Sequence, residues 1–116
     1  MDYRKKILGK IGGKVRYRYK GYGTIEGTIE NRCCREVKDV TGEYYPIVDY
    51  IVFDKDGEEV ESIRFGFYKL SKDGKLVWNR YAAFVEEVTE LKKLFKVAAD
   101  EIPEFKEIIE EVCQSL

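Results

Sequence analysis

The chain has 116 residues, of which 37% are charged and 44% are hydrophobic, and its formal net charge is −1. It contains no histidine, which excludes histidine-based catalysis, and three cysteines, an odd number that argues against a disulfide framework. No apolar run of about 20 residues could span a membrane, and the N-terminus lacks the apolar region of a signal peptide. We therefore expect a cytoplasmic protein with a single domain over 1–116 and no membrane partner.

Charge is distributed unevenly along this nearly neutral chain. The first 20 residues hold eight basic side chains and one acidic one, whereas residues 101–116 hold five glutamates and one lysine. A basic arm over residues 1–13, continuing into the next segment, is a local signal for binding anions. The abundance of Lys and Glu, with only two Asn and one Gln, resembles the composition of hyperthermophile proteins.

Residues 14–81 have the pattern of an antiparallel sheet. Lys14 to Lys20 alternates charged with apolar side chains, which is the period of a strand with one buried face. Further strands are predicted near 24–33, 47–53, 60–70 and 76–81, with a polar loop at 35–42. Two segments, Asp54-Lys55-Asp56-Gly57 and Ser71-Lys72-Asp73-Gly74, are hairpin turn sequences, so consecutive strands should pair as a meander.

Residues 82–116 are predicted to be helical. Apolar residues recur at alternating spacings of four and three, which predicts a helix with one apolar side, starting near Arg80. The series is Phe84, Val88, Leu91, Phe95, Ala98, Ile102, Phe105, Ile109, Val112 and Leu116. Pro103 should end this helix, because proline lacks an N–H and disfavours a helical conformation at the residue before it. The expected fold class is α+β: an antiparallel meander of about five strands backed by an amphipathic helix, plus a second short helix after Pro103.

Alternation also assigns the strand residues to two faces of the sheet. The face that the C-terminal helix should cover carries Val15, Tyr17, Tyr19, Ile25, Ile29, Ile63, Phe65, Phe67, Val77 and Tyr81. The opposite face carries Arg32 together with eight candidate ligand-binding residues: Arg16, Arg18, Lys20, Tyr22, Arg64, Tyr68, Trp78 and Arg80. A register error of one residue would exchange the faces of any strand.

Basic side chains interleaved with aromatic ones suit a single-stranded nucleic acid. Arginine and lysine neutralise phosphates, and aromatic rings stack on unpaired bases without regard to their sequence. We therefore expect a non-catalytic module that binds single-stranded DNA or RNA, with no cofactor and no metal. The arginines and Lys20 would contact phosphates, and Tyr22, Tyr68 and Trp78 would stack on bases.

Three other interpretations remain open. The basic face could simply be solvated, since edge strands often carry lysine and arginine. The chain could be a structural or regulatory oligomer, a dimer or tetramer formed through its C-terminal helices, that recognises another protein. It could also be a metal-dependent enzyme, because carboxylates are plentiful at Asp49, Asp54, Asp56, Glu59 and Glu61.

The order of elements resembles that of known single-stranded nucleic-acid-binding proteins. A meander that ends in Arg64-Phe65-Gly66-Phe67-Tyr68-Lys69, a Lys72-Asp73-Gly74-Lys75 turn and Leu76-Val77-Trp78 precedes an amphipathic helix. This order is similar to the PC4-like and PUR-type modules, and the terminal helical part is similar to that of the archaeal ThermoDBP group. The resemblance implies a curved sheet that binds the strand and a helix that backs it or forms the oligomer.

Overall fold

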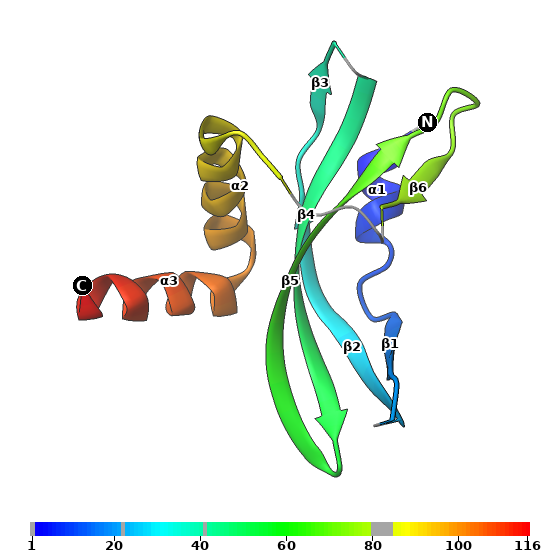
Figure 1. Ribbon diagram of the computed structural model, residues 1–116. Helices are drawn as coiled ribbons and strands as arrows, with labels where there is room; N and C mark the ends of the chain where they lie inside the picture. Colours follow the sequence, from blue (N-terminus) through cyan, green and yellow to red (C-terminus); the bar gives the residue numbers. More distant parts are fainter. Residues whose placement is uncertain (1, 22, 41, 80–84) are drawn as a thin grey trace.

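A computed structural model describes residues 2–21, 23–40, 42–79 and 85–116 of the chain. Within these residues the α+β class is confirmed: a six-stranded antiparallel sheet is accompanied by three helices (Figure 1). The elements are α1 (Tyr3–Leu8), β1 (Lys14–Tyr19), β2 (Gly23–Cys34), β3 (Val37–Asp39), β4 (Gly42–Lys55), β5 (Glu58–Leu70), β6 (Leu76–Trp78), α2 (Val88–Glu101) and α3 (Pro103–Ser115).

The strands pair in the order β1-β2-β4-β5-β6, which is the predicted meander. A sixth strand, β3, adds to the predicted number, because part of the segment expected to be a polar loop pairs with β4 beside the end of β2. The hairpin between β4 and β5 turns on Asp56 and Gly57, whose φ angles are 53° and 86°. Two successive positive φ angles define the turn that suits a two-residue hairpin, which explains the Asp-Gly sequence there.

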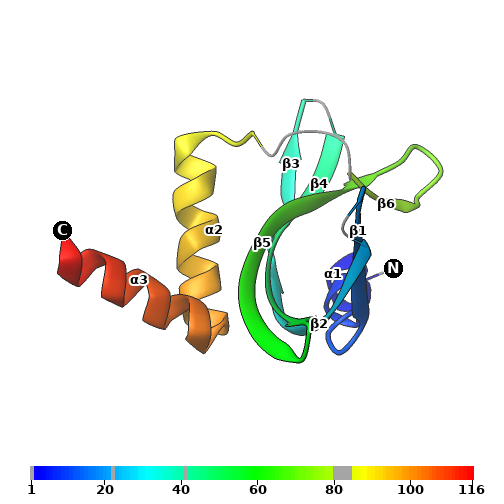
Figure 2. The same cartoon turned by 60° about the horizontal axis from the view of Figure 1, so that its bottom comes forward.

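The sheet is strongly curved and carries helices on both sides (Figure 2). On the convex side, Cys33, Val48 and Tyr50 pack against α2 and α3. On the concave side, Ile7 of α1 is 1% exposed and packs with Cys34, Tyr45 and Ile47 of the sheet. The basic arm therefore contains α1, which covers part of the concave side and docks there through the buried Ile7.

The predicted division into two faces also needs correction. Val15, Tyr17, Ile25 and Ile29 pack with Ile51 and Phe53 on the concave side. The partly buried Ile63 and the 38% exposed Phe65 instead lie on the convex side, against the helices. Two features of the sheet cause the difference. The register of β2 shifts between Ile29 and Asn31. In addition, the faces of two strands match only once their register is known, and alternation within each strand does not reveal the register.

The break at Pro103 is confirmed, since α2 ends at Glu101 and α3 begins at Pro103. In the C-terminal part of the chain the buried apolar residues are Leu94, Ala98, Ile102 and Phe105, of which Leu94 was not in the predicted series. The ends of the series are exposed: Val88 is 67% exposed, Val112 51% and Leu116 96%. The structure starts α2 at Val88, and Tyr81 and Phe84 lie outside the described residues.

The free cysteines divide into two environments. Cys33 and Cys34 are buried, and burial raises the pKa of Cys33 to about 12 and that of Cys34 to about 11. Cys113 on α3 is exposed. Among the described helices, none is long and apolar enough to cross a membrane.

Candidate nucleic-acid interface

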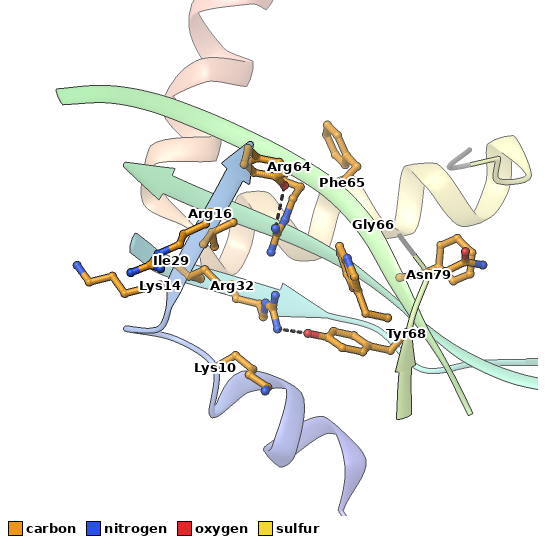
Figure 3. A pocket seen from close by; sticks show the side chains of 14 residues that line it. Lys10, Lys14, Arg16, Ile29, Arg32, Arg64, Phe65, Gly66, Tyr68 and Asn79 are labelled. Atoms are coloured by element: carbon orange, nitrogen blue, oxygen red, sulfur yellow. Dashed lines mark hydrogen bonds between the residues drawn. The ribbon is translucent and has the colours of Figure 1, made fainter. Parts of the chain in front are cut away.

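A cleft of about 720 Å³ opens on the concave side of the sheet, between β1 and β5 (Figure 3). The described residues that line it include five cationic side chains and no acidic one. The cationic residues are Lys10, Lys14, Arg16, Arg32 and Arg64. Trp78 and Tyr68 also line it, so aromatic rings and positive charge share one concave surface.

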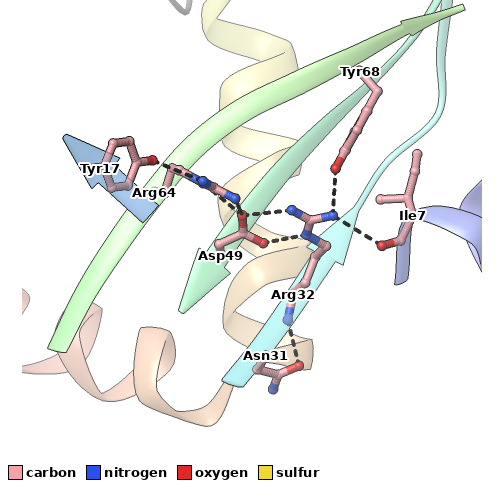
Figure 4. A network of polar contacts seen from close by, with 7 residues as sticks. All are labelled: Ile7, Tyr17, Asn31, Arg32, Asp49, Arg64 and Tyr68. Carbon is pink, nitrogen blue, oxygen red and sulfur yellow. Dashed lines mark hydrogen bonds and ion pairs between the residues drawn. The ribbon is translucent and has the colours of Figure 1, made fainter. Parts of the chain in front are cut away.

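Beneath the cleft lies a buried carboxylate that binds two arginines (Figure 4). Asp49 is 0% exposed and comes from the middle of β4. Its Oδ1 accepts from Nε of Arg32 at 2.5 Å, and its Oδ2 accepts from Nη2 of Arg32 at 3.0 Å. Oδ2 also accepts from Nη2 of Arg64 at 2.7 Å and from Nε of Arg64 at 3.1 Å.

These three side chains meet because of the pairing of the sheet. Asp49 stands opposite Arg32 on β2 and opposite Arg64 on β5. Directly opposed residues of antiparallel strands point to the same face, so all three point to the concave side. The group holds two positive charges and one negative charge, and a net positive charge therefore remains below the cleft.

Two tyrosine hydroxyls extend the network at its ends. Nη1 of Arg32 donates to the hydroxyl of Tyr68 at 3.0 Å and to the main-chain oxygen of Ile7 at 3.2 Å. Nη1 of Arg64 donates to the hydroxyl of Tyr17 at 3.0 Å. The network thus connects α1, β1, β2, β4 and β5, and it fixes the guanidinium groups in one arrangement.

The two arginines differ in their access to solvent. Both side chains line the cleft, but that of Arg32 is 1% exposed and that of Arg64 is 20% exposed, so Arg64 is the more accessible to solvent. Burial lowers the pKa of Arg32, but hydrogen bonding to Asp49 and the negative charge of that carboxylate outweigh burial and leave the pKa raised. The pKa of Arg64 is likewise raised, since the bonds to Tyr17 and Asp49 outweigh burial. Both arginines therefore stay charged.

The aromatic side of the cleft is built around Gly66. A Cβ on Gly66 would lie 2.3 Å from Cη2 of Trp78, so the indole ring occupies the space that a side chain would fill. The Trp78 ring centroid lies 5.0 Å from that of Tyr68, its cross-strand partner. The guanidinium carbon of Arg64 lies 4.9 Å from the Trp78 centroid, within the range of a cation–π contact.

The predicted binding residues are therefore brought together in part. Arg64, Tyr68 and Trp78 line the cleft, together with Arg32, and Arg16 lies at its margin. Arg16 also forms an ion pair with Glu26, and with Arg18 it borders a separate hollow on the outer side of β1. Lys20 is exposed beyond the end of β1, and Tyr22 and Arg80 lie outside the described residues.

Several residues of the site were not among the predicted binding residues. Lys10, Lys14 and Arg32 line the cleft, and Asp49 and Tyr17 belong to the network of hydrogen bonds. Asp49 was considered only as a metal-binding carboxylate, whereas both of its oxygens accept hydrogen bonds from arginine. Its position in a run of buried β4 residues, from Tyr45 to Ile51, was the available signal, because a buried acid needs a charged partner. Tyr17 was assigned to the face under the C-terminal helix, and no feature of the sequence alone places it beside Arg64.

Comparison with known proteins gives no match: no family model, no curated protein and no solved structure matches this chain. The arguments about function consequently rest on the cleft itself.

Proposed function

We propose that the protein is a non-catalytic, cytoplasmic module that binds single-stranded DNA or RNA in the cleft between β1 and β5. The observation that carries this proposal is the convergence of Trp78, Tyr68 and five cationic side chains in one cleft whose described lining contains no carboxylate. The cations supply phosphate contacts, and the rings supply stacking worth about 1–3 kcal/mol per base. We place the chain in the same functional class as the PC4-like, PUR-type and ThermoDBP proteins as part of this proposal.

The cleft favours unpaired over paired strands on physical grounds. Trp78 is only partly exposed and lies within the cleft, so a base must leave a double helix before it can contact the ring. Stacking does not involve the hydrogen-bonding edges that distinguish the bases, so the binding is largely independent of sequence. Lys10 and Lys14 at the margin add attraction for the backbone that screening by salt will weaken.

The proposal is tested by fluorescence anisotropy with labelled oligo-dT over a series of salt concentrations. We expect binding that weakens with salt, with a slope of about −0.7 for each phosphate contact. Lys14→Gln should lower both the affinity and the slope. Lys92→Gln is the matched control, since Lys92 is an exposed lysine on α2, on the other side of the sheet. No salt-sensitive binding below ~10 µM would refute the proposal.

A second candidate function has one observation in its favour. Helix α3 projects away from the sheet (Figure 1), and Ile108 and Val112 on it and Leu116 directly after it are 41%, 51% and 96% exposed. An apolar row on a projecting helix suits self-association, so we propose a homo-oligomer, a dimer or tetramer, formed through the C-terminal helices. The protein would then act as an interaction module without nucleic acid.

Light scattering on the intact protein and on Val112→Asp separates the two functions. The interaction module would be favoured if the intact protein has a multiple of the 13.6 kDa chain mass, the variant has the mass of one chain, and neither binds oligo-dT. A monomer at high concentration would remove the oligomer from the proposal.

A further inference from the structure

The hydroxyl of Tyr17 is a hydrogen-bond donor held beside a charged one. It accepts from Nη1 of Arg64, and a phenol that accepts one hydrogen bond still has its own proton to donate. Accepting from a cation polarises the O–H group and strengthens that donation. Arg64 uses three of its five N–H groups in its bonds to Asp49 and Tyr17. Tyr17 and Arg64 thus present neutral and charged donors 3.0 Å apart.

The aromatic ring that could receive a base lies directly beside this pair. The Arg64 guanidinium carbon is 4.9 Å from the Trp78 ring centroid, and all three residues line the same cleft. A phosphate on the donors would therefore have an aromatic surface next to it. The cleft volume of about 720 Å³ falls within the roughly 300–1,000 Å³ that is usual for small-ligand sites.

We propose that the cleft contains a complete site for one nucleotide, in which Tyr17 and Arg64 bind the phosphate and Trp78 contacts the base. This inference rests on the proposed nucleic-acid binding and specifies which group of the nucleic acid enters the cleft. Asp49 acts as a positioning residue, because its bonds to Arg64 hold the guanidinium in place before the ligand arrives. A ligand group that meets donors already in position loses little free energy to their ordering.

The first experiment needs no variant. Trp78 is the only tryptophan of the chain, so intrinsic fluorescence reports on the cleft itself. The intact protein is titrated with thymidine 5′-monophosphate, with thymidine and with inorganic phosphate at low salt. We expect saturable quenching by the monophosphate, with an affinity at least tenfold higher than for either part alone, because only the whole nucleotide contacts both the donors and the ring.

The second experiment removes one atom from the site. Tyr17→Phe deletes the hydroxyl and keeps the ring, whose centroid lies 5.8 Å from that of Phe53. Loss of one hydrogen bond to a charged group should weaken binding of the monophosphate by roughly tenfold to a hundredfold. The salt dependence should not change, since the lost donor is neutral. Tyr50→Phe is the matched control: it makes the same change on the convex side, where the hydroxyl donates to Glu61.

Each outcome distinguishes this inference from the proposed function. If oligo-dT binds while the monophosphate binds no better than thymidine, the one-nucleotide site is refuted and the nucleic-acid interface stands. Equal losses, or none, for Tyr17→Phe and Tyr50→Phe would also refute it. If the monophosphate binds as expected and oligo-dT does not, the site is supported and the proposed function fails.

Discussion

Replacing Asp49 with asparagine removes the one negative charge that the two arginines share and leaves the shape of the side chain intact. Asp49 is 0% exposed and accepts four hydrogen bonds from Arg32 and Arg64. Asparagine keeps one carbonyl oxygen as an acceptor, but it places an NH₂ group where a guanidinium now donates. The variant therefore has two cations with no counter-charge between them.

The magnitude of the effect follows from the burial of each arginine. Removing one partner of a buried ion pair costs about 3–5 kcal/mol. Arg32 is 1% exposed and bears the full cost, whereas Arg64 is 20% exposed and regains part of its hydration. The carbonyl oxygen of asparagine still accepts a hydrogen bond, so the cost should lie at the lower end of this range. We expect the free energy of unfolding to fall by about 3 kcal/mol. For a chain of 116 residues this corresponds to a decrease in Tm of about 12 °C.

Guanidinium denaturation followed by circular dichroism, at one pH and one protein concentration, measures this loss. Asp100→Asn serves as the control, because Asp100 is an exposed aspartate on α2 and its replacement should change stability by less than about 0.5 kcal/mol. If the stability of Asp49→Asn lies within about 1 kcal/mol of that of the parent protein, Asp49 does not hold the two arginines in place, and the argument for a preorganised cleft fails.

Three further predictions concern packing, reactivity and pH. Gly66→Ala should displace the ring of Trp78, shift its fluorescence maximum and cost about 1–3 kcal/mol through overpacking; an unchanged spectrum would contradict the contact. A thiol reagent at about pH 8 should modify Cys113 alone in the native protein and all three cysteines after unfolding, because the two buried thiols have raised pKa values; rapid modification of more than one native thiol would contradict this. The hydrogen bond from Arg35 holds the pKa of Glu90 below its usual value. The Arg35–Glu90 pair therefore stabilises the fold at pH values above the ordinary carboxyl pKa, and this stabilisation is lost as the pH falls through the lowered pKa of Glu90. Acid denaturation from about pH 5 to pH 3 should therefore destabilise the parent more than Arg35→Gln, and equal losses would show that this pair contributes nothing.

The parts of the fold that could be predicted from sequence are those fixed by local chemistry. The turn at Asp56 and Gly57 requires positive φ angles, and the end of α2 follows from the missing N–H of Pro103. Leu94 was missed because the predicted series required strict spacings of four and three, while the packed side of α2 passes through Leu94 and Ala98. α1 docks through the buried Ile7, with Tyr3 and Leu8 partly buried beside it, and three such residues in a charged arm are too short a signal to recognise.

The candidate site could be predicted along β5 and onto Trp78 of its hairpin partner β6, but not for its contacts with β1, β2 and β4. Arg64 and Tyr68 lie on one face because alternation holds along a single strand, and both line the cleft. Tyr17 joins them only because the curvature of the sheet brings β1 toward β5, and the period of a strand carries no information about curvature. Arg32 and Asp49 meet through the register of β2 against β4, which is set by pairing and by a shift in register.

The bond from Arg32 to the main chain of Ile7 connects the stability of α1 to the occupancy of the cleft. A helix of six residues is marginal in isolation, so α1 stays folded through its contacts with the sheet. Opening of α1 would release the Nη1 group of Arg32 and expose the buried surface around Ile47 to water. A ligand that binds only when Arg32 is held in place would oppose this opening, and by thermodynamic linkage the amide protons of α1 would then exchange with solvent more slowly. Hydrogen exchange in α1 would thus report on the proposed binding at a cleft formed mainly by the sheet.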